Sequence, residues 1–177
     1  MVFRKYLTYT ITVVALIATL AISYKLWTPG KDVTDGRYDR KQNGIWIQHA
    51  WLGDDMWFIR NKKTDKIASF RNSDEIKRLA SLFRKHNITD VFPHLCPSSQ
   101  NGEIPAVDHE QTEKFLNEFK RFRVMPWVGG VLGVQAFPER PEWRRNFVDS
   151  VSRLLSMYPD FAGINLNIEP CPSGDKD

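Results

Sequence analysis

The chain has 177 residues, 42% of them hydrophobic and 12% aromatic, which is enough apolar material for one folded domain of ordinary size. Its net charge of +4 comes from four basic residues within the first 31 positions, which hold no acidic residue: Arg4, Lys5, Lys25 and Lys31. The rest of the chain is balanced in charge, so composition predicts no basic face and no nucleic-acid partner.

Residues 1–27 are predicted to form an uncleaved transmembrane anchor. No charged residue occurs between Tyr6 and Tyr24, and the run has about the 20 residues that a helix needs to cross a bilayer. Arg4 and Lys5 favour a cytoplasmic amino terminus, which would place the folded domain outside the cytoplasm. A cleaved signal peptide is the alternative, because Ala21-Ile22-Ser23 resembles a cleavage site.

After a polar linker at 28–43, short apolar runs alternate with segments of helical periodicity. Strands are predicted at 44–52, 88–95, 123–128 and 161–169, and helices are predicted to begin near Ser73, Asp108 and Pro141. Ser73 and Asp108 are predicted to cap their helices, with Gln111 completing a capping box at Asp108. The insertion at 54–72 suggests a hairpin, because a polar turn separates Met56–Arg60 from Lys66–Phe70. Pro93 is expected near the end of its strand, since proline cannot donate to a ladder.

This order predicts an α/β fold with parallel strands and right-handed crossovers. Either a (β/α)8 TIM barrel cut at its middle or an open doubly wound sheet fits the order. No G-x-G-x-x-G motif opens a helix after a strand, so a nucleotide-binding sheet has little support. A complete barrel needs about 250 residues. We therefore expect 44–177 to be a truncated barrel of about four βα units.

The fourth predicted strand carries the strongest chemical signal. Side chains alternate along a strand, so Asn165, Asn167 and Glu169 share one face. Glu169 comes last, immediately before Pro170. In barrel enzymes the carboxyl ends of the strands hold the catalytic residues, so this polar face is predicted to point into the active-site end of the fold.

These residues resemble the D-G-x-D-x-D-x-E run on the fourth strand of glycoside hydrolase family 18, the chitinase-like barrels. Gly163 and Glu169 match it, while the three Asp positions are Ala162, Asn165 and Asn167. The resemblance implies that Glu169 protonates the leaving glycosidic oxygen as general acid. It also implies that Asn167 orients the substrate's 2-acetamido group, whose carbonyl attacks the anomeric carbon, as in substrate-assisted families. The implied substrates are β-linked N-acetylhexosamine glycans.

Two other resemblances bear on the same run. The Asn-x-Glu pair is similar to that of the endo-β-N-acetylglucosaminidases of family 85. Barrel glycosidases with an Asn-Glu-Pro run are a poorer match, because Ile168 separates Asn167 from Glu169.

Other candidate substrate-binding residues follow the remaining strands: His49, Trp51, His94 and Trp127, together with Asn165. Aromatic faces suit sugar rings, although Trp51 and Trp127 are also ordinary packing residues. The two histidines have no His, Asp or Glu partner at a metal-ligand spacing, so no metal site and no cofactor are expected. For Glu169 the structural alternative is a carboxylate paired with an arginine.

The sequence also bears on the disulfide state, on catalysis and on self-association. Cys96 and Cys171 follow predicted strands that are not neighbours, so a disulfide between them is not expected. Loss of the Asp positions suits a non-catalytic glycan- or cell-wall-binding protein as well as an enzyme. A half-barrel would be an inactive remnant or would close its sheet as a homodimer.

Overall fold

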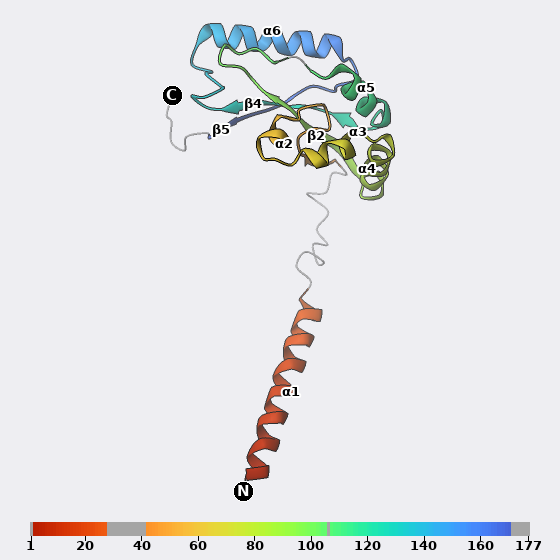
Figure 1. Cartoon of the computed structure of the whole chain (residues 1–177), viewed down its shortest axis with the longest axis vertical. Coiled ribbons are helices and arrows are strands. Elements are labelled where there is room, and N and C mark those ends of the chain that lie inside the picture. Colours follow the sequence, from red (N-terminus) through yellow and green to blue (C-terminus); the bar gives the residue numbers. More distant parts are fainter. Residues whose placement is uncertain (1, 28–41, 106, 171–177) are drawn as a thin grey trace. The chain divides into compact units, whose positions relative to one another are not determined.

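A computed structural model describes residues 2–27, 42–105 and 107–170. The chain divides into two compact units, 1–40 and 41–177. The first contains helix α1 (Val2–Leu26), and the second contains the sheet and the remaining helices (Figure 1). The predicted linker falls almost wholly on 28–41, and Cys171 also lies outside the described residues.

Helix α1 has the length and composition of a membrane span. The stretch Tyr9–Leu26 has a mean hydropathy of 1.6, and the apolar side chains described along it are exposed. A signal sequence passes the same test, so the choice between anchor and cleaved leader stays a prediction. What is confirmed is one apolar amino-terminal helix long enough to cross a bilayer.

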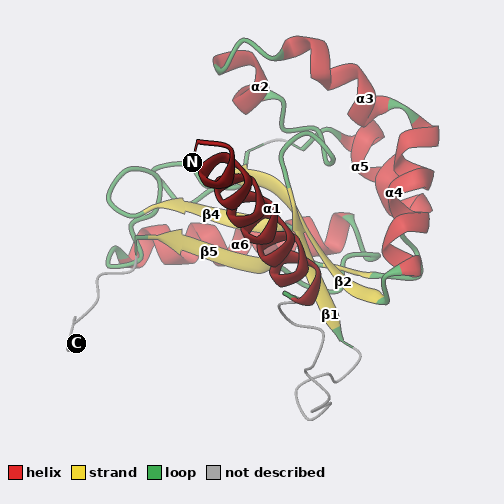
Figure 2. Ribbon diagram, turned by 90° about the horizontal axis from the view of Figure 1, so that it is seen from below, coloured by secondary structure: helices red, strands yellow, loops and turns green. Residues whose placement is uncertain are grey.

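The second unit is built on a curled parallel half-barrel sheet. Its strands are β1 (Asn43–Ile47), β2 (Ile88–Pro97), β3 (Arg123–Val124), β4 (Trp127–Val131) and β5 (Asn165–Glu169). They lie in the order β1-β2-β4-β5, with β3 pairing to β2, and every pairing is parallel. The predicted alternation of strands and helices is confirmed, while the strands of the described residues do not close into a barrel (Figure 2).

Three amphipathic helices supply one side of the core: α4 (Ser73–Lys85), α5 (His109–Glu118) and α6 (Pro141–Met157). Their apolar residues, such as Ile76, Phe115 and Phe147, form one cluster with Val91 and Val128 of the sheet. Asp108 caps α5 as predicted by accepting from the backbone N–H of Gln111. Burial of these stripes against the sheet is the main stabilising term of the domain.

The predicted hairpin at 54–72 is wrong. The segment forms two short helices, α2 (Met56–Arg60) and α3 (Ile67–Arg71), joined by the 3-10 turn η1 (Thr64–Lys66). Phe58 and Phe70 are buried with Ala50 in a small second core. This burial stabilises helices too short to form alone, because most helical stability in proteins comes from tertiary packing.

Prolines account for two further differences from the predicted strands. The third strand breaks into β3 and β4 at Met125-Pro126, because Pro126 has no N–H to continue the ladder. Pro93 does not end its strand: β2 continues to Pro97, with Pro93 fully buried opposite Ile47. The missing donor of Pro93 is tolerated there, so the second strand is longer than predicted.

Candidate functional site

The inner face of the sheet carries a row of aromatic and polar side chains. On β2, Val91 and Leu95 point into the helix-covered core, so the alternate residues Phe92 and His94 point to the inner face. The register pairs His94 with Trp127 on β4, and Trp127 with Asn165 on β5. Three residues predicted from the sequence as substrate-binding candidates thus lie at one level on neighbouring strands: His94, Trp127 and Asn165.

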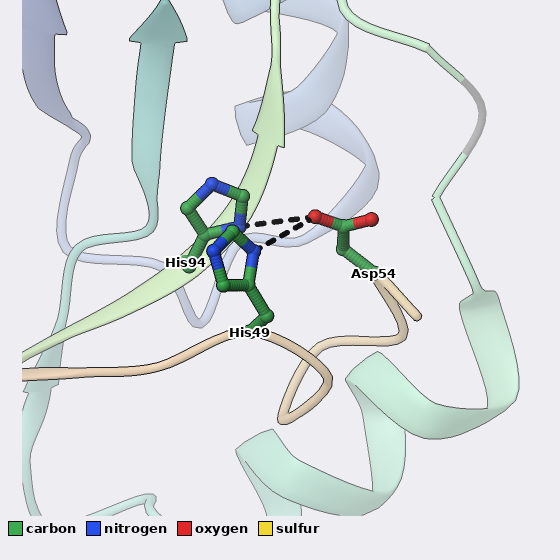
Figure 3. A group of neighbouring side chains, drawn as sticks. All are labelled: His49, Asp54 and His94. Carbon is green, nitrogen blue, oxygen red and sulfur yellow. Dashed lines mark hydrogen bonds and ion pairs between the residues drawn. The ribbon is translucent and has the colours of Figure 1, made fainter. Parts of the chain in front are cut away.

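A histidine–aspartate–histidine cluster lies at this level (Figure 3). The Nδ1 atoms of His49 and His94 lie 3.1 and 3.2 Å from the same oxygen, Oδ2 of Asp54. His94 comes from β2, while His49 and Asp54 lie in the turns that follow β1. His49 makes a hydrogen bond with the carboxylate, whereas the buried Nδ1 of His94 has no well-aligned partner among the described residues.

Stacking fixes both imidazole rings. The ring of His94 is stacked on Trp127 at 4.3 Å between centroids, and the ring of His49 on Trp57 at 5.7 Å. The two imidazoles also contact each other, with centroids 3.7 Å apart. Because each ring is held by an aromatic neighbour, the ring nitrogens keep their direction toward Asp54.

The loop that carries Asp54 is tied down on both sides. The backbone N–H of Met56 donates to Asp54 Oδ1, which leaves Oδ2 facing the histidines. Arg71 of α3 forms an ion pair with Asp55 at 2.6 Å and donates to the backbone oxygen of Ala50 at 2.7 Å. Gly53 lies so close to Asp108 that a Cβ atom would meet its side chain at 2.2 Å. The position of Asp54 therefore depends on α3 as well as on its own turn.

Burial and charge set the protonation of the cluster. Burial would raise the pKa of Asp54, but its contacts with His49 and His94 outweigh burial and hold that pKa well below the usual range. Burial lowers the pKa of His94, and the neighbouring carboxylate only partly offsets the shift. The cluster thus combines an ionised carboxylate with an imidazole that favours its neutral form. Burial also raises the pKa of Cys96 to about 12, so its thiol stays protonated.

The residues of the cluster line two cavities. One of about 300 Å³ is lined by His49 and His94 together with the aromatic residues Trp46, Phe92 and Trp127. The other, of about 340 Å³, is lined by Asp54 and by residues of the following loop and of β2. The first cavity is predominantly aromatic with a few polar groups, which is the usual character of a small-molecule site.

Strand β5 brings the remaining predicted residues to the same face. Asn167 donates from Nδ2 to Glu169 Oε1 at 2.8 Å, and the Glu169 side chain is exposed. The Oδ1 atom of Asn165 is buried and has no partner among the described residues. Gly129 of β4 allows close approach here, since a Cβ atom would meet the backbone oxygen of Asn167 at 1.8 Å. No ion pair between Glu169 and an arginine occurs in the part of the chain that the structure describes.

Trp51 lies apart from this group. Its ring packs edge-on against Phe70 at 4.8 Å between centroids and also faces Phe115 of the main core. Among the described ring contacts, none joins Trp51 to His49, His94 or Trp127. These contacts agree with the packing role considered from the sequence, and a role of Trp51 in substrate binding stays a prediction.

Sequence reasoning missed Asp54, Trp46 and Phe92. The expectation that the histidines lack an acidic partner is wrong, because Asp54 contacts both. Asp54 follows His49 by five residues, and this proximity in the sequence could have indicated that the two interact. His94 belongs to the next strand, and only the fold brings it to Asp54. Trp46 and Phe92 are paired neighbours on the inner face, which the alternation of β1 and β2 would have indicated.

The chain matches no protein-family profile, no curated protein and no solved structure.

Proposed function

We propose that the inner face of the half-barrel binds β-linked N-acetylhexosamine glycans and that Glu169 acts on them as general acid. One observation carries the proposal: an aromatic cavity lined by Trp46, Phe92 and Trp127 lies in register with Asn165. The same face of β5 continues from this cavity with three polar residues, Asn165, Asn167 and Glu169. Aromatic faces suit the apolar faces of sugar rings, while amides suit hydroxyl and acetamido groups.

In this proposal Asn167 orients the 2-acetamido group and Glu169 protonates the leaving oxygen. The hydrogen bond from Asn167 Nδ2 to Glu169 Oε1 supports a shared role, because it holds the two side chains together at the carboxyl end of the strand. Carboxyl ends of parallel strands are where (β/α)8 enzymes carry their chemistry. We accordingly propose that the curled sheet belongs to a barrel of that class.

A non-catalytic glycan-binding protein is the second candidate. The exposure of Glu169 favours it, since the acid of a glycosidase normally lies in a water-shielded pocket. The aromatic cavity serves binding equally well in either case. The two candidates therefore assign different roles to Glu169, catalytic in one and not in the other, and the same glycan-binding role to Trp46.

The deciding experiment compares Glu169→Gln with wild type, using the full chain in detergent and β-1,4-linked N-acetylglucosamine oligomers. The enzyme proposal predicts release of new reducing ends by wild type and a loss of about 100-fold or more in the variant, the typical contribution of a general acid. The Kd for the oligomer should change little. Glu110→Gln removes an exposed carboxylate on α5 and should keep wild-type activity. Oligomer binding without hydrolysis by wild type would select the binding protein.

Trp46 tests the glycan site itself. Its side chain is 63% exposed, so Trp46→Ala removes a binding surface at little cost to the core. The variant should bind the oligomers more weakly, measured by calorimetry. Trp27→Ala, which removes a similarly exposed tryptophan from the first unit, should bind as wild type does. Unchanged binding by Trp46→Ala would contradict the proposed site.

We also propose that the folded unit lies outside the cytoplasm. Arg4 and Lys5 before the apolar helix support this orientation. Protease added to intact cells tests it: an extracytoplasmic domain is cleaved while the membrane stays sealed, whereas protection of the domain would contradict the orientation.

A further inference from the structure

We propose that His49, Asp54 and His94 form a binding site for one divalent transition-metal ion, with Zn²⁺ as the best fit. This inference does not depend on the glycan proposal, although His49 and His94 also line the aromatic cavity on which that proposal rests.

The separations of the ligand atoms fit a tetrahedral ion. One nitrogen or oxygen from each residue lies within 4.8 Å of the other two. The two contacts with Asp54 Oδ2 are 3.1 and 3.2 Å. In a tetrahedral zinc site with bonds of about 2.1 Å, neighbouring ligand atoms are about 3.4 Å apart. The two contacts with Asp54 therefore need to lengthen by only a few tenths of an ångström to match such a site.

The geometry of the contact between His94 Nδ1 and Asp54 is a second observation. The atom is buried and points toward Asp54, yet it makes no well-aligned hydrogen bond among the described residues. A buried nitrogen that contacts a carboxylate at 3.2 Å without good hydrogen-bond geometry is only partly satisfied. A metal ion between His94 and Asp54 satisfies it, since a ring nitrogen without a proton donates its lone pair to the ion.

The chemistry of the donors selects the class of ion. Two imidazole nitrogens and one carboxylate oxygen suit zinc and other first-row transition ions, whereas calcium and magnesium require mainly oxygen ligands. Three protein ligands leave a fourth tetrahedral position for water, as in catalytic rather than structural zinc sites. His49 and His94 line one cavity and Asp54 lines another, so an exchangeable ligand has space on either side.

The surroundings hold the three side chains as the outer shell of a metal site does. Met56 N–H orients the carboxylate, while Trp57 and Trp127 fix the two rings by stacking. Such outer-shell contacts typically change metal affinity by about 10- to 100-fold when they are removed. Preorganisation of this kind distinguishes the cluster from a chance meeting of exposed side chains.

The test uses the full chain in detergent, stripped with a chelator and then titrated with Co²⁺ and Zn²⁺. We expect one Co²⁺ per chain, the intense visible d–d absorption of a tetrahedral ion, and displacement of that absorption by Zn²⁺. Asp54→Asn and His94→Gln should each weaken binding by more than the roughly 100-fold upper value for outer-shell losses. His86→Gln, which removes an exposed histidine outside the cluster, should bind as wild type does.

Three results would overturn the inference. The first is a folded wild-type chain that shows no tetrahedral Co²⁺ spectrum. The second is equal binding by wild type and by the folded Asp54→Asn or His94→Gln variants, with fold checked by circular dichroism. The third is loss of binding in His86→Gln. If both ligand variants fail to fold, His49→Gln replaces them, and the wild-type spectrum still decides whether the ion is bound tetrahedrally.

Discussion

The close approach of β4 and β5 makes Gly129 a sensitive test of the structure. Gly129 has φ +146°, a conformation that side chains other than glycine rarely adopt, and an added Cβ atom would lie 1.8 Å from the backbone oxygen of Asn167. The strain alone costs about 1–3 kcal/mol. The clash adds to it, because a backbone atom cannot rotate away as a side chain can. Gly129→Ala should therefore reduce the free energy of unfolding by at least about 3 kcal/mol, near the upper end of single substitutions.

Gly133→Ala is the matched control. Gly133 also has a positive φ, +73°, but no atom lies within 4 Å of the position that an alanine methyl group would take, so only the conformational cost of about 1–2 kcal/mol applies. Urea denaturation of the full chain in detergent, followed by tryptophan fluorescence, measures both variants. Equal destabilisation by the two alanines would refute the close strand contact, and with it the placement of Asn167 and Glu169 relative to β4.

Three further predictions concern other parts of the second unit. Arg71→Met should lower the free energy of unfolding by about 1–3 kcal/mol, because it removes the ion pair with Asp55 and the hydrogen bond to Ala50. Arg78→Met removes only an exposed pair with Glu75 and should change that free energy by no more than about 1 kcal/mol, as measured by urea denaturation. Burial raises the pKa of Asp90, but hydrogen bonds from Arg123 and Thr89 outweigh burial and hold that pKa below its usual value of 3.8. Asp90 therefore stabilises the fold above about pH 4 and loses this effect as pH falls further, so Asp90→Asn should be less stable at pH 6 with a gap that narrows below pH 4. Finally, the outer strands β1 and β5 each pair with a neighbour on one edge, and their other edge has no partner among the described strands. An unpaired strand edge favours pairing with a second chain, so we expect discrete dimers in sedimentation equilibrium with density-matched detergent. A strictly monomeric or polydisperse chain would contradict this expectation.

The sequence was informative wherever local pattern and tertiary packing agree. Helices α4 and α6 combine apolar residues at helical spacing with favourable amino-terminal residues, so their starts at Ser73 and Pro141 are predictable. Even there the cap of α4 was missed by one residue: Asn72, rather than Ser73, accepts from the backbone N–H of Asp74. Both residue types are good caps, so sequence alone cannot choose between neighbours.

The segment after β1 was not predictable in the same way. Met56–Arg60 and Ile67–Arg71 are each five residues long, and periodicity does not distinguish strand from helix at that length. Burial of Phe58 and Phe70 against Ala50 decides the outcome. Ala50 itself has φ +73°, an uncommon conformation for alanine that no sequence pattern signals.

The same turn explains why the histidine–aspartate cluster escaped prediction. Its members come from β2 and from the turns that follow β1, and their meeting depends on the parallel pairing of β1 with β2. The loop is held by Arg71, which lies at the end of the second short helix. The cluster is thus a product of tertiary structure, whereas the polar face of β5 could be predicted because strand alternation alone generates it.

The two proposals can be separated because of the register of the sheet. His94, Trp127 and Asn165 lie at one level, while Glu169 lies four residues further along β5, or about 13 Å at the usual rise of a strand. A carboxylate at that distance cannot coordinate an ion held by His94. Glu169→Gln should therefore leave the Co²⁺ spectrum unchanged, and Asp54→Asn should abolish the spectrum whether or not the chain hydrolyses glycans. If Asp54→Asn instead also weakens oligomer binding, the stack of His94 on Trp127 is the physical link, because loss of the ion would free the imidazole that supports the tryptophan.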